Sequence, residues 1–166
     1  QGGVILFGNS LVHDSSWRFG DRRVDNCGVQ GMTLADFAAG ADVWPVTASP
    51  SAVVVSFGTV EAVRGAYDGA RWRSDLRAAQ IMLEARYPGA RLIFLAPPPV
   101  AAGAPGANAA IADMNAALAQ FDAETLDAGA ALGGRSATEL TYDGVHLTRA
   151  AYRDWQSALG EMIDAR

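Results

Sequence analysis

The sequence of 166 residues contains no lysine, because all 13 of its basic residues are arginine. A lysine nucleophile and a Schiff-base lysine are therefore excluded. Cys27 is the only cysteine, so no disulfide can form within the chain. One cysteine and two histidines, without the spacing of metal ligands, argue against a zinc site, and we expect neither a metal nor a cofactor.

No apolar run is long enough to span a bilayer, so no membrane-spanning segment is expected. The formal net charge is −5 and the arginines are scattered along the chain, which argues against nucleic-acid binding. Length and ordinary composition predict one domain over residues 1–166, without a linker or repeat. The chain begins at Gln1 rather than Met, which we interpret as removal of upstream residues. Compartment and oligomeric state stay open.

Apolar strand-like segments alternate with helix-like segments along the whole chain. Such alternation implies right-handed crossovers and a parallel sheet with helices on both faces, so the predicted fold class is α/β. Residues 53–55 form a run of three valines, which is typical of a central parallel strand. Strands are predicted at residues 4–7, 23–27, 52–57, 92–96 and 125–128, and helices at residues 33–39, 72–87, 108–122 and 148–165.

The first predicted strand ends in a serine. Residues 4–12 read Val-Ile-Leu-Phe-Gly-Asn-Ser-Leu-Val, an apolar run followed by a helix-compatible stretch. This order places Ser10 on a strand-to-helix turn, where backbone N–H groups and the helix dipole favour negative charge. A hydroxyl there can attack a carbonyl while nearby amides hold the oxyanion. From this segment alone, a phosphate-binding or purely structural turn is an equal alternative.

A histidine lies near the other end of the chain, in residues 142–148, Tyr-Asp-Gly-Val-His-Leu-Thr. Asp143 precedes His146 by three positions, so its carboxylate can fix the imidazole tautomer. The second ring nitrogen is then free to take a proton from a serine. A surface aspartate beside a helix cap at Thr148 is the structural alternative.

Four blocks of the sequence resemble those of the SGNH (GDSL-type) hydrolases. Residues 8–11, Gly-Asn-Ser-Leu, resemble the nucleophile block Gly-Asp-Ser-Leu, with asparagine where aspartate is usual. Residues 26–31 resemble the second block, Asn-x-Gly-x-x-Gly, and residues 143–148 resemble the last, Asp-x-x-His-Leu. Residues 57–61 stand where the family has Gly-x-Asn-Asp. The resemblance implies a three-layer α/β/α sandwich with about five parallel strands, flavodoxin-like in arrangement.

The resemblance also implies a catalytic triad. Ser10 becomes the nucleophile, His146 the general base and Asp143 the orienting acid. His13 lies three residues after the serine and is a rival base, but only His146 has an acidic partner at the spacing of the family. Cys27 as a nucleophile is conceivable, although a small buried filler is the favoured interpretation.

Two backbone amides are expected to form the oxyanion hole, those of Ser10 and Gly28. The family supplies a third donor from an asparagine side chain, and here that position is Val60, which cannot donate. Loss of one such donor costs on the order of 10²–10³ in rate. Three outcomes stay open: the hole works with two donors, a neighbouring side chain takes over, with Asn9 and Thr59 nearest in sequence, or the protein is a weak or inactive relative of the family.

We therefore predict a serine esterase that cleaves small acyl esters, such as acetyl groups on a sugar or alcohol. The alternatives are a non-catalytic module that binds carbohydrate or an anion, and an O-acyltransferase with the same triad. For the aromatic residues near the motif loops, Phe19 included, packing in the core is the competing interpretation, and for Glu61 a structural role. The candidate substrate-binding residues are Leu11, Trp17, Trp44, Glu61, Tyr142 and Val145.

Overall fold

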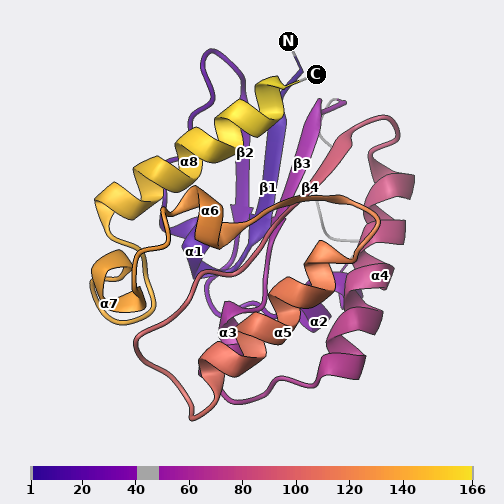
Figure 1. Cartoon of the computed structure of the whole chain (residues 1–166). Helices are drawn as coiled ribbons and strands as arrows, with labels where there is room; N and C mark the ends of the chain where they lie inside the picture. Colours follow the sequence, from indigo (N-terminus) through magenta and orange to yellow (C-terminus); the bar gives the residue numbers. More distant parts are fainter. Residues whose placement is uncertain (1, 41–48, 166) are drawn as a thin grey trace.

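The computed structural model describes residues 2–40 and 49–165. A parallel sheet of five strands in the order β2-β1-β3-β4-β5 forms its centre (Figure 1). This observation confirms the predicted sheet. The strands are β1 (Val4–Gly8), β2 (Val24–Gly28), β3 (Ala52–Ser56), β4 (Arg91–Leu95) and β5 (Glu124–Leu126).

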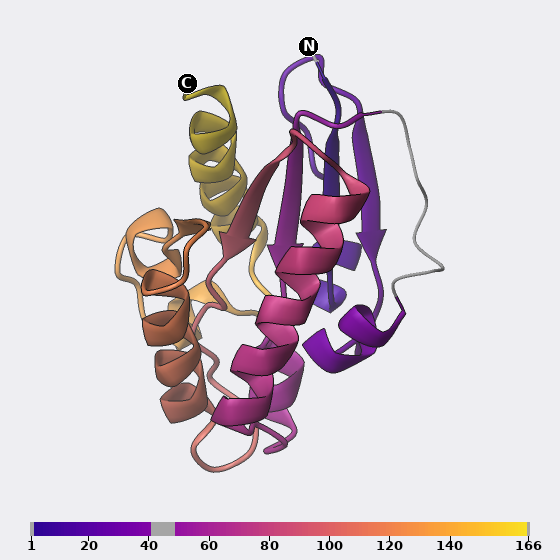
Figure 2. The same cartoon turned by 90° about the vertical axis from the view of Figure 1, so that its right-hand side faces the viewer.

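Helices cover both faces of the sheet, as predicted for a three-layer α/β/α sandwich. Helix α8 lies on one face, and α2 and α4 lie on the other (Figures 1 and 2). Within the described residues the helices are α1 (Ser10–His13), α2 (Leu34–Ala39), α3 (Thr59–Val63), α4 (Gly69–Arg86), α5 (Ala107–Ala119), α6 (Ala128–Ala131), α7 (Ala137–Leu140) and α8 (Arg149–Asp164).

Strands β1 and β3, two of the three interior strands, are buried at every position because helices cover both of their faces. Phe7 of β1 packs against Phe37 of α2, with the ring centroids 5.0 Å apart. On the α8 side, Trp155 is fully buried and packs 5.9 Å from the ring of Trp17. These contacts fix the sheet between its two helical layers.

The three strands on the β2 side of the sheet end at one level. Gly8 of β1 pairs with Gly28 of β2 on one side and with Ser56 of β3 on the other. The chain passes from β1 outward to β2 and then returns to β3, so the strand order reverses at β1. Ligands of open α/β sheets bind in the crevice at such a switch point, beyond the carboxyl ends of the strands.

The last strand differs from the prediction. It covers Glu124–Leu126 rather than residues 125–128, because Asp127 caps helix α6 and accepts a hydrogen bond from Ala130 N at 2.6 Å. Helices α3, α6 and α7 were not predicted. Each has four or five residues, which is too short for a helical period to emerge from the sequence.

Candidate active site

Ser10 is held at the rim of the sheet by the turn that joins β1 to α1. Asn9 is buried and caps the helix, since its Oδ1 accepts a hydrogen bond from Leu11 N at 3.0 Å. The carbonyl of Asn9 accepts from Val12 N and His13 N at 3.1 and 3.0 Å. Ser10 is therefore the first residue of α1, and its N–H has no partner within the helix.

His146 lies on a loop that the chain anchors on both sides. Thr141 and Leu147 form an antiparallel bridge, and Tyr142 N donates to the carbonyl of His146 at 3.0 Å. Gly144 has a φ of 91°, and its carbonyl accepts from the N–H groups of residues 101 and 102 at 2.7 and 3.0 Å. A Cβ at Gly144 would lie 2.6 Å from the Ala102 side chain, so the loop requires glycine there.

Three side chains from the two ends of the chain form one line of hydrogen bonds. Asp143 Oδ2 lies 2.6 Å from Nδ1 of His146. Nε2 of His146 lies 2.9 Å from Oγ of Ser10. With the aspartate accepting from Nδ1–H, Nε2 is the acceptor for the serine hydroxyl.

Asp143 is ionised over the whole range in which an imidazole changes charge. Burial by itself would raise the pKa of Asp143. The hydrogen bonds from the His146 ring and from the backbone N–H groups of His146 and Val145 outweigh that cost and lower the pKa to about 2. The two backbone bonds to Oδ1 measure 2.7 and 2.9 Å. A carboxylate held in this way keeps the imidazole in one tautomer and one orientation.

The Gly28 amide is not free. Its N–H donates to Oδ1 of Asn26 at 3.0 Å, so the predicted donor would have to leave this bond to reach an oxyanion. The absence of a side chain at Gly28 has a packing reason, since a Cβ would lie 2.4 Å from His13 N.

The amide of Asn26 also donates to the carbonyls of Val12 and Ser15, at 2.9 and 3.2 Å. Asn26 thus ties β2 to the end of α1, a role that its place in the second block signalled and that we missed.

The third donor position is occupied by the partly buried Val60 in the first turn of α3. Both predicted substitutes are buried: Asn9 is 1% exposed and Thr59 is 3% exposed. Asn9 Nδ2 has no hydrogen-bond partner among the described residues. Asn9 is therefore a candidate with a buried, unused donor.

Of the two rival residues, His13 is engaged elsewhere and the thiol of Cys27 is disfavoured as a nucleophile. Nδ1 of the exposed His13 lies 2.6 Å from Oδ1 of Asp14, which also accepts from Gln30 at 3.1 Å. Cys27 is half-buried, and burial together with the charge of Asp25 raises the pKa of its thiol. A raised pKa disfavours the reactive thiolate.

The candidate substrate-binding residues do not gather at one place. Leu11 and Trp17 are corrections, because both belong to the core and Trp17 Nε1 donates to Val12 O at 3.0 Å. Phe19 stacks on the Trp17 ring, so it too is a core residue. Val145 is partly buried and packs against the core. Trp44 lies outside the described residues.

Tyr142 is the candidate that lies at the triad. Its side chain is 70% exposed, and its ring stacks near the His146 ring with centroids 6.0 Å apart. A cavity of about 390 Å³ opens beside these two rings. Its polar lining includes Thr148 and Arg149, which follow His146 closely, and Asp14, whose distance from them in the sequence gave no signal of a common site.

Within residues 2–40 and 49–165, no three histidine, cysteine, aspartate or glutamate residues lie together as the ligands of a metal ion would. None of the helices in these ranges combines the length and the apolar character that a bilayer span requires.

A family model for the GDSL-like lipase/acylhydrolase family matches residues 6–153, and the chain belongs to this family. No match was found among curated proteins. Among solved structures, a proposed acylhydrolase from Bacteroides fragilis superimposes with a TM-score of 0.82 at 21% identity, covering 98% of this chain and 86% of the other. A GDSL-like lipase from Bacteroides thetaiotaomicron gives 0.78 at 17%, covering 98% and 88%.

An acetylxylan esterase from Geobacillus stearothermophilus gives a TM-score of 0.75 at 16% identity, covering 99% of this chain and 95% of the other. At these identities the likeness shows the fold. It agrees with the predicted SGNH hydrolase fold and with the resemblance of the four sequence blocks.

Proposed function

We propose that the protein is a serine esterase that cleaves small acyl esters through an acyl-Ser10 intermediate. The observation that carries the proposal is the line of hydrogen bonds from Ser10 Oγ to His146 Nε2 and from His146 Nδ1 to Asp143. Membership of the GDSL-like lipase/acylhydrolase family supports ester chemistry.

The reaction follows from the positions of these atoms. His146 takes the proton of the Ser10 hydroxyl as its oxygen attacks the ester carbonyl, and the Ser10 amide donates to the resulting oxyanion. The imidazolium then gives its proton to the leaving alcohol. Water enters, loses a proton to His146 and attacks the acyl-serine, which releases the acid and restores the hydroxyl. Asp143 stabilises the imidazolium throughout.

The surroundings of His146 support a polar alcohol as leaving group. The leaving oxygen receives its proton from Nε2, so the alcohol lies on the histidine side of the site. The cavity on that side offers a carboxylate, a guanidinium and a hydroxyl, from Asp14, Arg149 and Thr148. The exposed ring of Tyr142 gives a flat surface of the kind on which sugar rings stack.

A small acyl group is favoured because the space under the nucleophile is filled. Leu11 follows Ser10 directly and is fully buried in the core. An acetylated sugar combines a small acyl group with a polar alcohol as leaving group. The fold likeness to an acetylxylan esterase is consistent with such a substrate.

Hydrolysis of p-nitrophenyl acetate and release of acetate from an acetylated xylo-oligosaccharide test the proposal. We expect turnover of both, and a slower rate with p-nitrophenyl octanoate. Ser10→Ala should abolish all three activities, whereas Ser74→Ala, at an exposed serine of α4, should retain them. A non-catalytic binding module would show no turnover in either protein.

A further inference from the structure

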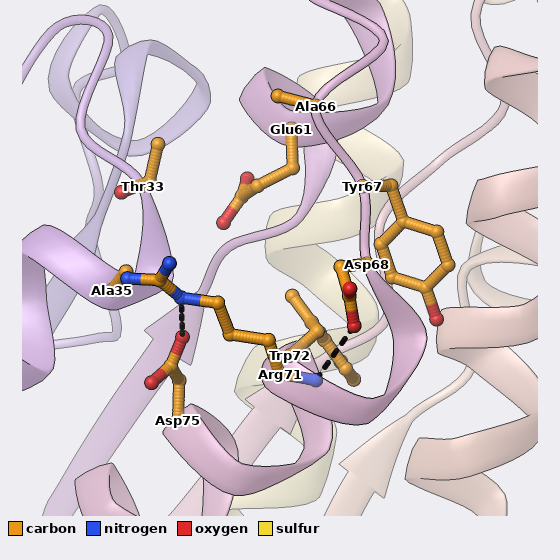
Figure 3. Close-up of a pocket in the computed structure, with 9 residues that line it drawn as sticks. All are labelled: Thr33, Ala35, Glu61, Ala66, Tyr67, Asp68, Arg71, Trp72 and Asp75. Atoms are coloured by element: carbon orange, nitrogen blue, oxygen red, sulfur yellow. Dashed lines mark hydrogen bonds and ion pairs between the residues drawn. The ribbon is translucent and has the colours of Figure 1, made fainter.

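A second cavity, of about 150 Å³, lies between α2, α3 and the first turns of α4 (Figure 3). No member of the Ser10 triad lines it. Its walls come from segments that the proposed reaction does not use. Its lining includes Ala35, Glu61, Tyr67, Arg71, Trp72 and Asp75.

Glu61 is the unusual group in this cavity. Its side chain is 8% exposed, and its Oε1 accepts a hydrogen bond from Leu34 N at 2.8 Å. Its Oε2 has no hydrogen-bond partner among the described residues. Figure 3 shows the carboxylate extending from α3 into the space between Thr33 and Arg71. A buried carboxylate with an unused oxygen costs free energy unless a donor reaches it.

The charges around Glu61 do not neutralise it. Burial raises the pKa of Glu61, and the nearby carboxylate of Asp36 adds to this rise, whereas the backbone N–H groups of Leu34, Glu61 and Gly58 oppose it. Arg71 is directed to a different acid, since its Nε lies 3.8 Å from Oδ2 of Asp75. Asp68 caps α4 by accepting from Arg71 N at 2.9 Å. Within the part of the chain that the structure describes, the cavity therefore carries an excess of negative charge.

The walls beside Glu61 are apolar and aromatic. The rings of Tyr67 and Trp72 meet edge to face, with centroids 6.4 Å apart, and Ala35 and Ala66 supply the other apolar part of the lining. Aromatic rings attract cations through their π-faces, and the attraction grows when the cation is desolvated. An acid, two rings and small apolar groups together recognise an organic cation with a short alkyl part.

We propose that this cavity binds the ammonium group of a small amine, with the positive charge facing the Glu61 carboxylate and the alkyl part packed against Tyr67 and Trp72. A divalent metal fits less well, because such an ion prefers six or more oxygen ligands. A neutral alcohol supplies a donor to Glu61 but leaves the excess negative charge of the cavity uncompensated. The proposal is independent of the esterase activity.

Titration of the ¹⁵N-labelled protein with ethylammonium chloride, followed by amide chemical shifts, tests this assignment. The amide of Leu34 is the direct reporter, because it donates to Glu61. We expect a saturable shift of the Leu34 amide and nuclear Overhauser contacts from the ethyl protons to the rings of Tyr67 and Trp72. Sodium chloride and ethanol at the same concentrations are the matched controls, and neither should reproduce the saturable shift.

Two variants make the outcome specific. Glu61→Gln keeps the shape and an oxygen for Leu34 N but removes the charge, and it should weaken ethylammonium binding about tenfold or more. Ser10→Ala should bind as the parent protein does, which separates this result from failure of the esterase proposal. Equal binding by Glu61→Gln, an equal response to ethanol or sodium, or absence of contacts to both rings in the parent protein would overturn the assignment. If Glu61→Gln does not fold, the nuclear Overhauser contacts to Tyr67 and Trp72 in the parent protein still decide whether the assignment holds.

Discussion

Nε2 of His146 lies 2.9 Å from Oγ of Ser10, although 136 positions of sequence separate the two residues. The register of the sheet and the anchored loop before α8 bring them together. His13, three residues from the serine, instead meets Asp14 at 2.6 Å. The structure thus favours the distant histidine as the general base.

The two histidines should behave differently on substitution. His146→Ala should lower kcat for p-nitrophenyl acetate by on the order of 10³–10⁴ or more, because the hydroxyl of Ser10 loses its proton acceptor. His13→Ala should retain most of the rate, since His13 is exposed and paired with Asp14. Steady-state kinetics of both variants check this. Comparable losses at the two positions would contradict the assignment of His146.

Asp143 should act through His146 and should not titrate in the working range. Its pKa of about 2 lies below the ordinary value of 3.8, so it stays ionised wherever the imidazole titrates. The plot of log kcat/KM against pH should therefore fall toward acid with a slope of one. Asp143→Asn should lower kcat by on the order of 10³–10⁴, because the amide favours the wrong imidazole tautomer. A slope of two above about pH 5 would mean that a second group takes part.

The same lowered pKa has a consequence for stability. The native state holds the ionised form of Asp143 better than the unfolded chain does. Its stabilising contribution is complete above the ordinary pKa of 3.8 and is lost as the pH falls toward about 2. Acid unfolding of Asp143→Asn should lack this part of the pH dependence. An acid transition identical to that of the parent protein would contradict the pairing.

Gly28 should be essential for packing. A Cβ there would lie 2.4 Å from the backbone N of His13 and 2.8 Å from its Cα, and backbone atoms cannot yield as a flexible side chain can. Gly28→Ala should lower the free energy of unfolding by about 1–3 kcal/mol. Gly160→Ala in α8 is the matched control, because its Cβ would lie 3.6 Å from Phe19, an ordinary contact. That variant should gain up to about 1 kcal/mol from helix propensity. Urea unfolding measures both, and a fully stable Gly28→Ala would refute the packing argument.

The oxyanion hole can be tested with a pair of substitutions. If the hole lacks a third donor, Val60→Asn should raise kcat more than it changes KM, because the new bond forms mainly in the transition state. The gain should stay below about 10²–10³, since an amide introduced in this first turn of α3 is not preorganised toward the oxyanion. If Asn9 Nδ2 already donates, Val60→Asn should be neutral or harmful. Asn9→Asp, which keeps the capping oxygen and removes the NH₂, should then lower kcat.

The sheet and the Asp143–His146 contact could be predicted because each depends on a local pattern, whereas the Ser10–His146 contact spans 136 positions and was expected from the family resemblance of the sequence blocks. The apolar runs ending in Ser10 and around Val54 specify buried parallel strands, and the spacing from Asp143 to His146 specifies a side-chain contact. The second-block asparagine, Asn26, was part of the motif, but its hydrogen bonds to the carbonyls of Val12 and Ser15 depend on how closely the end of α1 approaches β2. Sequence periodicity carries no information on such approach.

The surroundings of the candidate site were harder to predict. Trp17 and Leu11 lie next to the motif in the sequence, but their side chains point into the core, because apolar groups gain most from burial there. Arg149 and Asp14 reach the same cavity from opposite ends of the chain. The cavity at Glu61 depends on where α2 meets α4, a tertiary arrangement without a local signature.

Reaction with a fluorophosphonate, followed by intact mass and peptide mapping, tests the central claim most directly. Attack by an activated serine displaces fluoride and leaves one phosphonyl group on its oxygen, so the label reports the nucleophile itself. The account predicts one adduct per chain, on Ser10, with strongly reduced labelling in His146→Ala and none in Ser10→Ala. A folded parent protein that stays unlabelled, or an adduct on another residue that persists in Ser10→Ala, would contradict it.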